Sequence, residues 1–144
     1  MPVDFIDRSG EAIEAMSEAI EAALEAIGNQ AVSHAKSNID SKIPRHGGPT
    51  TGSLKNSISH AVATDENTVY IGTNNEYAIY NEFGTGIYAD GGRGRQSPWS
   101  YKDDKGQWHR TRGITPIHFL KNAVQEHIDE YQRIAEAEIK SHQP

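Results

Sequence analysis

The sequence predicts an α+β protein in which an antiparallel sheet of hairpins packs against a long N-terminal helix and a C-terminal helix. Near both ends of the chain, apolar residues recur at three- and four-residue steps, which is typical of amphipathic helices. Between them lie two pairs of short runs that turn residues join, which is typical of hairpins. Because helices and strands are segregated along the chain, α+β is favoured over alternating α/β.

Length and composition indicate one small domain over residues 1–144, with 35% hydrophobic residues and therefore a lean core. The absence of cysteine excludes disulfides, thiolate metal sites and cysteine nucleophiles. The first residues lack the pattern of a signal peptide, and no apolar run is long enough for a membrane span, so we expect no membrane association.

The long first helix is predicted over residues 9–43, with Ser9 as its N-cap and Pro44 ending it. Gly28 is a point where it could bend. Its predicted apolar stripe consists of Ile13, Met16, Ile20, Leu24, Ile27 and Ala31. A second stripe about 200° away is acidic and consists of Glu11, Glu14, Glu18, Glu21 and Glu25. The net charge of residues 1–30 is −6, which equals that of the whole chain, so the acidic charge is concentrated on this helix.

The middle of the chain is predicted as a loop from Pro44 to Gly52, a hairpin over residues 54–73 and a short helix over residues 75–84. Asn74 or Asn75 is expected to cap the short helix, and Gly84 to stop it in a left-handed conformation.

Residues 87–113 are predicted as a loop and hairpin arm, in which 88–98 form a mobile loop and the hairpin strands begin at Trp99 and Trp108. A C-terminal helix is predicted over residues 116–140, with Pro116 in its first turn. Its inward side chains are expected to be Leu120, Val124, Ile128 or His127, Tyr131, Ala135 and Ile139.

No catalytic, cofactor or metal site is expected. The seven histidines are scattered, and no two lie four apart on one helix with a glutamate between them. His118 and His127 are nine apart, on opposite sides of a helix. The glycine-rich stretches lack the lysine of a nucleotide-binding loop, so a conformational role is favoured.

The arm carries a basic and aromatic pattern that has three interpretations: nucleic-acid binding, cross-strand aromatic pairs with solvated charges, or an interface with another protein. The cross-strand interpretation is favoured over nucleic-acid binding. The pattern consists of Arg93, Arg95, Lys102, Lys105, Arg110 and Arg112, interleaved with Trp99, Tyr101 and Trp108.

Glu82 is unusual because it lies in the last turn of a short helix, where the helix dipole disfavours an acid. No second catalytic group is evident, so catalysis is disfavoured. We expect its carboxylate to accept hydrogen bonds from the following glycine-rich backbone, or to pair with Arg45 or Arg112.

Three elements, in order, resemble the neck, or tail-completion, proteins of tailed bacteriophages, also known as head–tail joining or minor tail components. Residues 51–58 resemble the Thr-Gly-x-Leu-x-x-Ser-Ile element. Ile71-Gly72-Thr73, Tyr77-Ala78 and Glu82-Phe83-Gly84-Thr85-Gly86 resemble the central element. Pro116, Phe119, Leu120 and Ala123 resemble the start of the closing helix. The insertion from Tyr88 to Gly113 is longer than the minimal family pattern.

The resemblance implies a structural virion protein without catalytic activity that forms a homo-oligomeric ring at the head–tail junction, after assembly in the host cytoplasm. Other neck and tail proteins would be its partners, and DNA would pass the lumen without specific binding. The expected interface or structural residues are Tyr77, Tyr80, Glu82, Phe83, Gly84, Thr85, Gly86, Trp99 and Trp108. The acidic residues Glu14, Glu18 and Glu21 would line the lumen, because negative charge repels phosphates.

Overall fold

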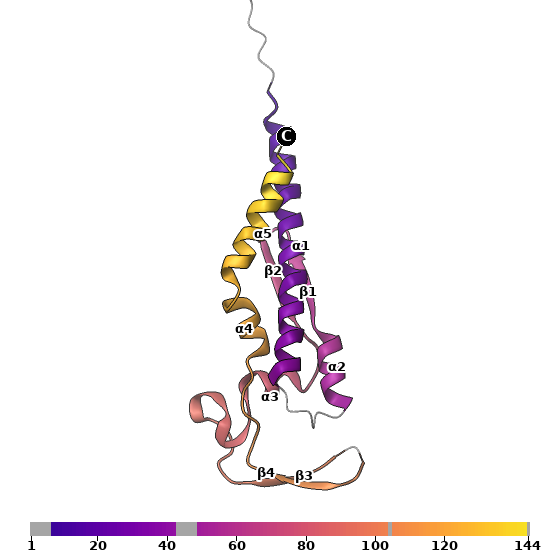
Figure 1. The fold of residues 1–144 in the computed structure, drawn as a ribbon, viewed down its shortest axis with the longest axis vertical. Coiled ribbons are helices and arrows are strands. Elements are labelled where there is room, and N and C mark those ends of the chain that lie inside the picture. Colours follow the sequence, from indigo (N-terminus) through magenta and orange to yellow (C-terminus); the bar gives the residue numbers. More distant parts are fainter. Residues whose placement is uncertain (1–6, 43–48, 104, 144) are drawn as a thin grey trace, which may run out of the picture.

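The structure is a computed structural model that describes residues 7–42, 49–103 and 105–143 (Figure 1). Its mixture of helices and antiparallel hairpins confirms the α+β class. The helices are α1 (Ser9–Lys42), α2 (Pro49–Ser57), α3 (Ala78–Phe83), α4 (Phe119–Gln125) and α5 (Ile128–Ser141). The strands are β1 (Ser59–Ala63), β2 (Thr68–Gly72), β3 (Trp99–Lys102) and β4 (Trp108–Thr111).

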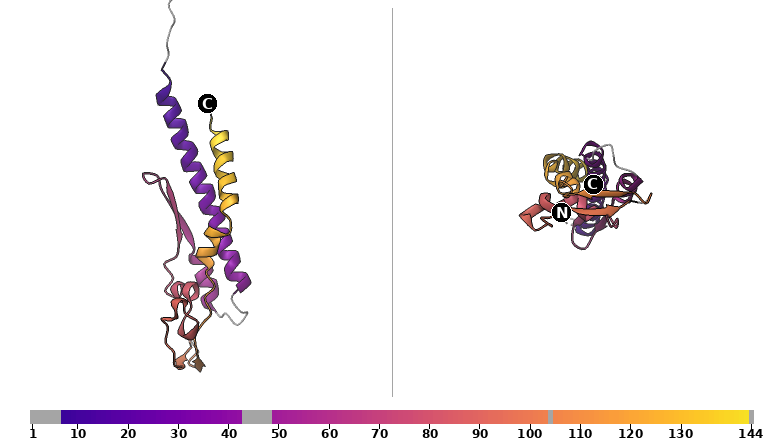
Figure 2. Two further views of the ribbon diagram at one scale, coloured as in Figure 1. Left: turned by 90° about the vertical axis from the view of Figure 1, so that its left-hand side faces the viewer. Right: turned by 90° about the horizontal axis from the view of Figure 1, so that it is seen from below.

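The elements form an elongated molecule in which α1 lies between two layers (Figures 1 and 2). The β1–β2 hairpin packs on one side of α1, and α4 and α5 pack on the other. The β3–β4 hairpin forms a separate two-stranded sheet at the end of the molecule opposite the first turns of α1. We call the segment from Ile87 to Arg112, which includes β3 and β4, the arm.

Helix α1 is continuous as predicted, but its buried face differs from the predicted stripe. Ile13 and Met16 are 68% and 49% exposed, so the stripe is wrong at its start. The buried side chains are mainly small: Ala19, Ala23, Ala31, Ala35 and Ile39. Small side chains on a helix that packs on two sides let both layers approach closely, which apolar periodicity alone does not reveal.

Gly28 does not bend α1. A Cβ atom at this position would lie 2.5 Å from the His60 ring and 2.9 Å from the Val69 side chain. The absence of a side chain therefore allows the β1–β2 hairpin to pack directly on the helix, and this close approach explains the glycine.

The first hairpin forms with its turn at residues 64–67, and its register runs from Ser59 opposite Gly72 to Ala63 opposite Thr68. Its predicted start is wrong, because residues 54–57 belong to α2. The predicted loop is also wrong over residues 49–52, which are helical, whereas residues 44–48 lie outside the described part of the chain. Leu54 and Ile58 both enter the core, whereas Asn56 between them is exposed. In a strand Asn56 would lie on the same face as Leu54 and Ile58, so this burial pattern fits a helical period.

The predicted C-terminal helix is divided into α4 and α5, with a break at residues 126–127. It begins at Phe119, not at Pro116. Phe119 and Ala123 are buried, whereas Val124 and Ile128 are about half exposed, so the predicted inward positions are wrong at these two residues. The break changes the phase of the apolar face, and His127, the alternative to Ile128, is the partly buried residue.

The core lies where the C-terminal half of α1 meets α2, α3 and α4. Asn38 supports this junction by donating a hydrogen bond from its side chain to the backbone oxygen of Phe119, at 3.2 Å. The cluster consists of Ala35, Ile39, Leu54, Ile58, Ala78, Ile117, Phe119 and Ala123. The core thus supports α3, the centre of the predicted interface segment.

Candidate functional site

The short helix α3 starts with a turn made by Asn75. The Asn75 side-chain oxygen accepts a hydrogen bond from the Tyr77 N–H at 2.8 Å, and its backbone oxygen accepts one from the Ala78 N–H at 3.2 Å. The helix therefore begins at Ala78, and Glu76 lies before it. Gly84 ends the helix with φ +77° and ψ 173°, so the positive φ agrees with the prediction but ψ is extended rather than left-handed.

Glu82 lies on the inner side of α3 and is only 6% exposed. Its two carboxylate oxygens accept hydrogen bonds from the backbone N–H groups of Leu120 and Lys121, each at 2.9 Å. These groups belong to the first turn of α4, where N–H groups have no partner within the helix. Glu82 is therefore a buried cap for another helix, and its charge is stabilised by the positive end of the α4 dipole.

This contact corrects the prediction for Glu82. The carboxylate does accept backbone hydrogen bonds, but from α4 rather than from the following glycines. Among the described residues it forms no ion pair, so Arg112 is not its partner, and Arg45 lies outside them. Glu82 accepts from α4 because the start of this helix lacks a local acceptor. His118, which precedes α4, has φ +49° and provides no side-chain cap.

The Gly84-Thr85-Gly86 segment pairs with the returning chain at the base of the arm. The Thr85 N–H donates to the Ile114 oxygen at 2.9 Å, and the Ile87 N–H donates to the Arg112 oxygen at 3.1 Å. A Cβ atom on Gly86 would overlap the Arg112 carbonyl oxygen, and one on Gly113 would overlap that of Thr85. These glycines therefore allow two backbones to pack in direct contact.

Large apolar side chains on α3 and the turn after it face solvent. Ala78 and Glu82 take the inner positions of the helix, whereas its aromatic residues are about half exposed. We call this region the aromatic surface, and each of its members is 40–57% exposed: Tyr77, Ile79, Tyr80, Phe83, Ile87 and Tyr88. Large exposed side chains on a firmly held element are typical of protein interfaces.

The arm has short helical turns at its start, where the sequence predicted a loop, and has the predicted hairpin at its tip. Residues 86–88 and 90–92 form 3₁₀ turns, and Asp90 lies 3.2 Å from the His118 ring nitrogen. Tyr101 stacks across the strands on His109 at 5.3 Å, so this cross-strand aromatic contact is present.

The two tryptophans of the arm do not pair with each other. In the register, Trp99 lies opposite Thr111 and Trp108 opposite Lys102. The Arg95 guanidinium lies 5.6 Å from the Trp99 ring, whereas Trp108 is 70% exposed. All six cations of the arm are exposed, so Trp108 and these charges are available to a partner.

The acidic stripe of α1 is exposed, including Glu14, Glu18 and Glu21. The first turns of α1 extend beyond both neighbouring layers (Figure 2), and Ile13 and Met16 are exposed there as well. Glu25, at the end of the stripe, accepts a 2.7 Å hydrogen bond from His60 on the hairpin. The acidic charge that is concentrated on this helix in the sequence is therefore exposed to solvent.

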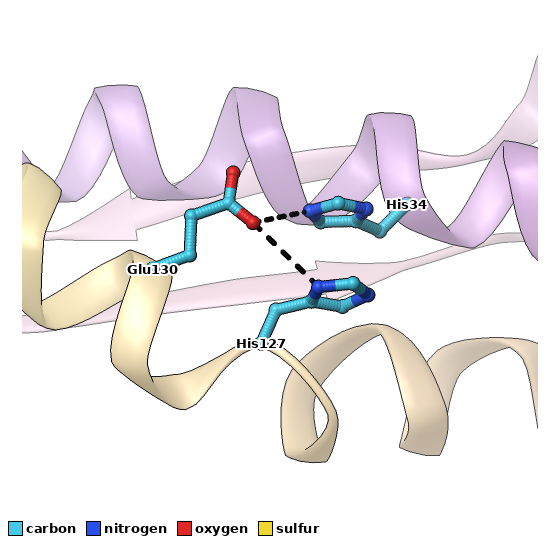
Figure 3. A group of neighbouring side chains, drawn as sticks. All are labelled: His34, His127 and Glu130. Carbon is cyan, nitrogen blue, oxygen red and sulfur yellow. Dashed lines mark hydrogen bonds and ion pairs between the residues drawn. The ribbon is translucent and has the colours of Figure 1, made fainter.

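A cluster of His34, His127 and Glu130 lies between α1 and α5 (Figure 3) and was missed in the sequence. The sequence signal for paired histidine ligands is their spacing within one helix, whereas His34 and His127 are 93 positions apart. The hydrogen bond from His34 and the charges of both histidines lower the pKa of Glu130. Only the i, i+3 spacing of His127 and Glu130 could have drawn attention to this site.

Beside this cluster, burial raises the pKa of Tyr131 to about 12, and its hydroxyl donates to the Ala123 backbone oxygen across the α4–α5 break. The folded state holds Tyr131 in its protonated form, and tyrosine in an unfolded chain titrates near pH 10. The contribution of protonated Tyr131 to the free energy of unfolding is therefore complete below about pH 10 and is lost as the pH rises toward 12. We expect Tyr131→Phe to lose about 0.5–1.5 kcal/mol at pH 7. Urea unfolding between pH 7 and 12 should show a smaller alkaline loss in the variant, and equal losses would contradict the assignment.

A family model matches residues 4–84, which is more than half of the chain. The protein is therefore a structural component of a bacteriophage tail. It belongs to the HK97-gp10-like family, whose description reads "Bacteriophage HK97-gp10, putative tail-component". The match extends from the start of the chain to the end of α3, so the arm, α4 and α5 lie outside it. Comparisons with curated proteins and with solved structures gave no match.

Proposed function

We propose that this tail component acts at the head–tail junction, where copies of the chain form a closed ring through which DNA passes. The observation that carries the proposal is the aromatic surface on α3. Its inner side is fixed by Glu82 and by the glycine contacts, so its outer side presents apolar groups in a defined geometry. Preorganised aromatic side chains are effective anchors of protein contacts.

The arm supplies a second surface for the same assembly. It projects sideways from the end of the molecule that also carries α3 (Figure 1), and it exposes Trp108. Two different surfaces on one subunit support a head-to-tail contact between neighbours, and such a contact forms a ring when its rotation closes. In this arrangement Tyr77, Tyr80, Phe83, Trp99 and Trp108 belong to the interface, which also contacts other neck and tail proteins.

The exposed acids Glu14, Glu18 and Glu21 would line the lumen of this ring. Negative charge on the wall repels DNA phosphates, so the genome can slide without specific binding. No catalytic role is included, because the buried acid Glu82 is fully engaged as a helix cap. Among the described residues, no helix is both long and apolar enough to cross a membrane. The site of action would be the virion, after assembly in the host cytoplasm.

Replacement of Phe83 by serine should prevent ring formation while leaving the thermal stability almost unchanged, because Phe83 is exposed. The measurement is native mass with negative-stain imaging of the purified full chain. Tyr70→Ser is the matched control, since Tyr70 is equally exposed but lies on β2, away from the aromatic surface. Closed rings in the wild type and control but not in Phe83→Ser are expected. Rings in all three would show that the aromatic surface is not the interface.

A second candidate function is nucleic-acid binding by the arm, which the exposure of all its cations and of Trp108 favours. In that case the purified chain should bind DNA at low salt, and binding should weaken steeply as salt rises. At the same low salt, Trp108→Ala should bind DNA more weakly than the wild type, because stacking of Trp108 on the bases is lost. The absence of binding at low salt would remove this candidate and leave the arm as a protein interface.

A further inference from the structure

Two helices that are distant in sequence bring three metal-ligand groups together. His34 Nε2 lies 2.8 Å from Glu130 Oε2, and His127 Nδ1 lies 3.6 Å from the same oxygen. All three ligand atoms lie within 4.8 Å of one another, and all three side chains are partly buried (Figure 3). The cluster is separate from the aromatic surface and the arm, and nothing in the proposed assembly uses it.

The chemistry of the three groups matches one class of ion. Two imidazoles and one carboxylate are a ligand set that zinc accepts, with water at the fourth position. Ligand atoms on one zinc ion, at bonds of about 2.0–2.2 Å, lie about 3.4 Å from each other in tetrahedral geometry. The 3.6 Å contact from His127 to Glu130 is close to this spacing, and the 2.8 Å contact from His34 is a hydrogen bond that would lengthen when the ion binds. Magnesium and calcium prefer oxygen ligands, so the two imidazoles select against them.

Two changes are needed before both imidazoles can bind the same ion. The rings are stacked 3.5 Å apart with planes 4° from parallel, and an ion bound to a ring nitrogen lies in the plane of that ring. His127 is the ring that can turn, because it lies at the α4–α5 break and makes the longer contact. Glu130 and Gln30 both contact His34 Nε2. An ion bound to this nitrogen would replace both contacts, with Glu130 remaining beside it as a second ligand.

We propose that His34, His127 and Glu130 bind one divalent transition-metal ion of the zinc type, which fastens α5 to α1. Helix α5 has no fully buried side chain, so its attachment to α1 depends on partly buried contacts. An ion that binds only the folded chain adds a direct link between these helices and stabilises the fold.

The test is thermal unfolding of the full, tag-free chain at pH 7.5, with no metal, with zinc chloride or with magnesium chloride. Zinc at 100 times its dissociation constant should lower the unfolding constant about 100-fold, and magnesium should have no effect. A calorimetric titration should give one zinc ion per chain. If zinc neither stabilises nor binds the wild type, the proposal is wrong.

His127→Gln removes one ligand at a partly exposed position, and His142→Gln is the matched control, because His142 is similarly exposed and also lies near a glutamate. The control should respond to zinc like the wild type, and His127→Gln should bind zinc at least tenfold more weakly. Equal binding by both variants would assign the ion elsewhere and overturn the proposal. If His127→Gln fails to fold, Glu130→Gln takes its place. Cobalt(II) provides a second measurement, since its visible absorption should appear with the wild type and be lost with the ligand variant.

Discussion

Replacement of Gly86 by alanine should lower the free energy of unfolding by about 2–4 kcal/mol. The new methyl group would overlap the Arg112 carbonyl oxygen, which a backbone contact fixes in place. The residue would also keep φ at +63°, where alanine is strained. Urea unfolding of the purified variant measures the loss, which should come with weaker attachment of the arm.

Gly92→Ala is the matched control for this prediction. Gly92 has nearly the same backbone angle, φ +67°, but no atom lies within 4 Å of the position of an added Cβ. The control therefore contains the backbone strain without the overlap and should lose only about 1–2 kcal/mol. Equal losses in both variants would contradict the conclusion that close backbone packing requires Gly86.

The second large effect is expected for Glu82→Ala, which should also lose about 2–4 kcal/mol. The change removes two hydrogen bonds to a carboxylate and leaves the Leu120 and Lys121 N–H groups without their acceptor in a partly buried site. Urea unfolding measures the loss in the free energy of unfolding. Because these groups belong to the first turn of α4, amide hydrogen exchange in that turn should also become faster.

Two further variants test the charge and the location of this cap. Glu82→Gln keeps one acceptor oxygen but loses the charge, so its loss should lie between those of wild type and Glu82→Ala. Glu76→Ala removes an exposed acid just before α3 and should change stability by less than about 0.5 kcal/mol. If Glu82→Ala is no more harmful than Glu76→Ala, the carboxylate does not cap α4.

Short sequence patterns predicted those elements that depend on residues close together in the chain. The helical period gave α1 over nearly its full length, turn residues gave both hairpins, and Gly84 marked the end of α3. Apolar periodicity failed where burial depends on whether a neighbouring layer covers the helix. Ile13 and Met16 continue the period of α1, but no layer covers the part of the helix on which they lie.

The interactions that organise the site could not be predicted, because they join distant parts of the chain. Glu82 contacts backbone groups 38 and 39 positions away, and backbone groups carry no sequence signal. Gly86 was recognised as part of a motif, but its partner at Arg112 depends on how the arm returns. The break between α4 and α5 likewise depends on packing against α1, since residues 126–127 contain neither glycine nor proline.

These long-range contacts explain how the aromatic surface is held in place. Its inner residues, Ala78 and Glu82, connect it to the core and to α4, and the glycines after it fix the base of the arm. The inner side of α3 is thus fixed by packing and hydrogen bonds, while its aromatic side chains face outward. The chain that carries them is a member of a phage tail-component family. A surface of this kind suits the proposed role as a contact between subunits of an assembly.

The most direct test of the proposed ring is a cryo-electron microscopy map of the neck of intact virions, at a resolution that allows this chain to be traced. The proposal predicts a closed ring of this chain between head and tail tube. Phe83 and Trp108 should be buried between neighbouring subunits, and Glu14, Glu18 and Glu21 should face the channel. A neck without this chain, or a ring that leaves the aromatic surface exposed, would contradict the proposal.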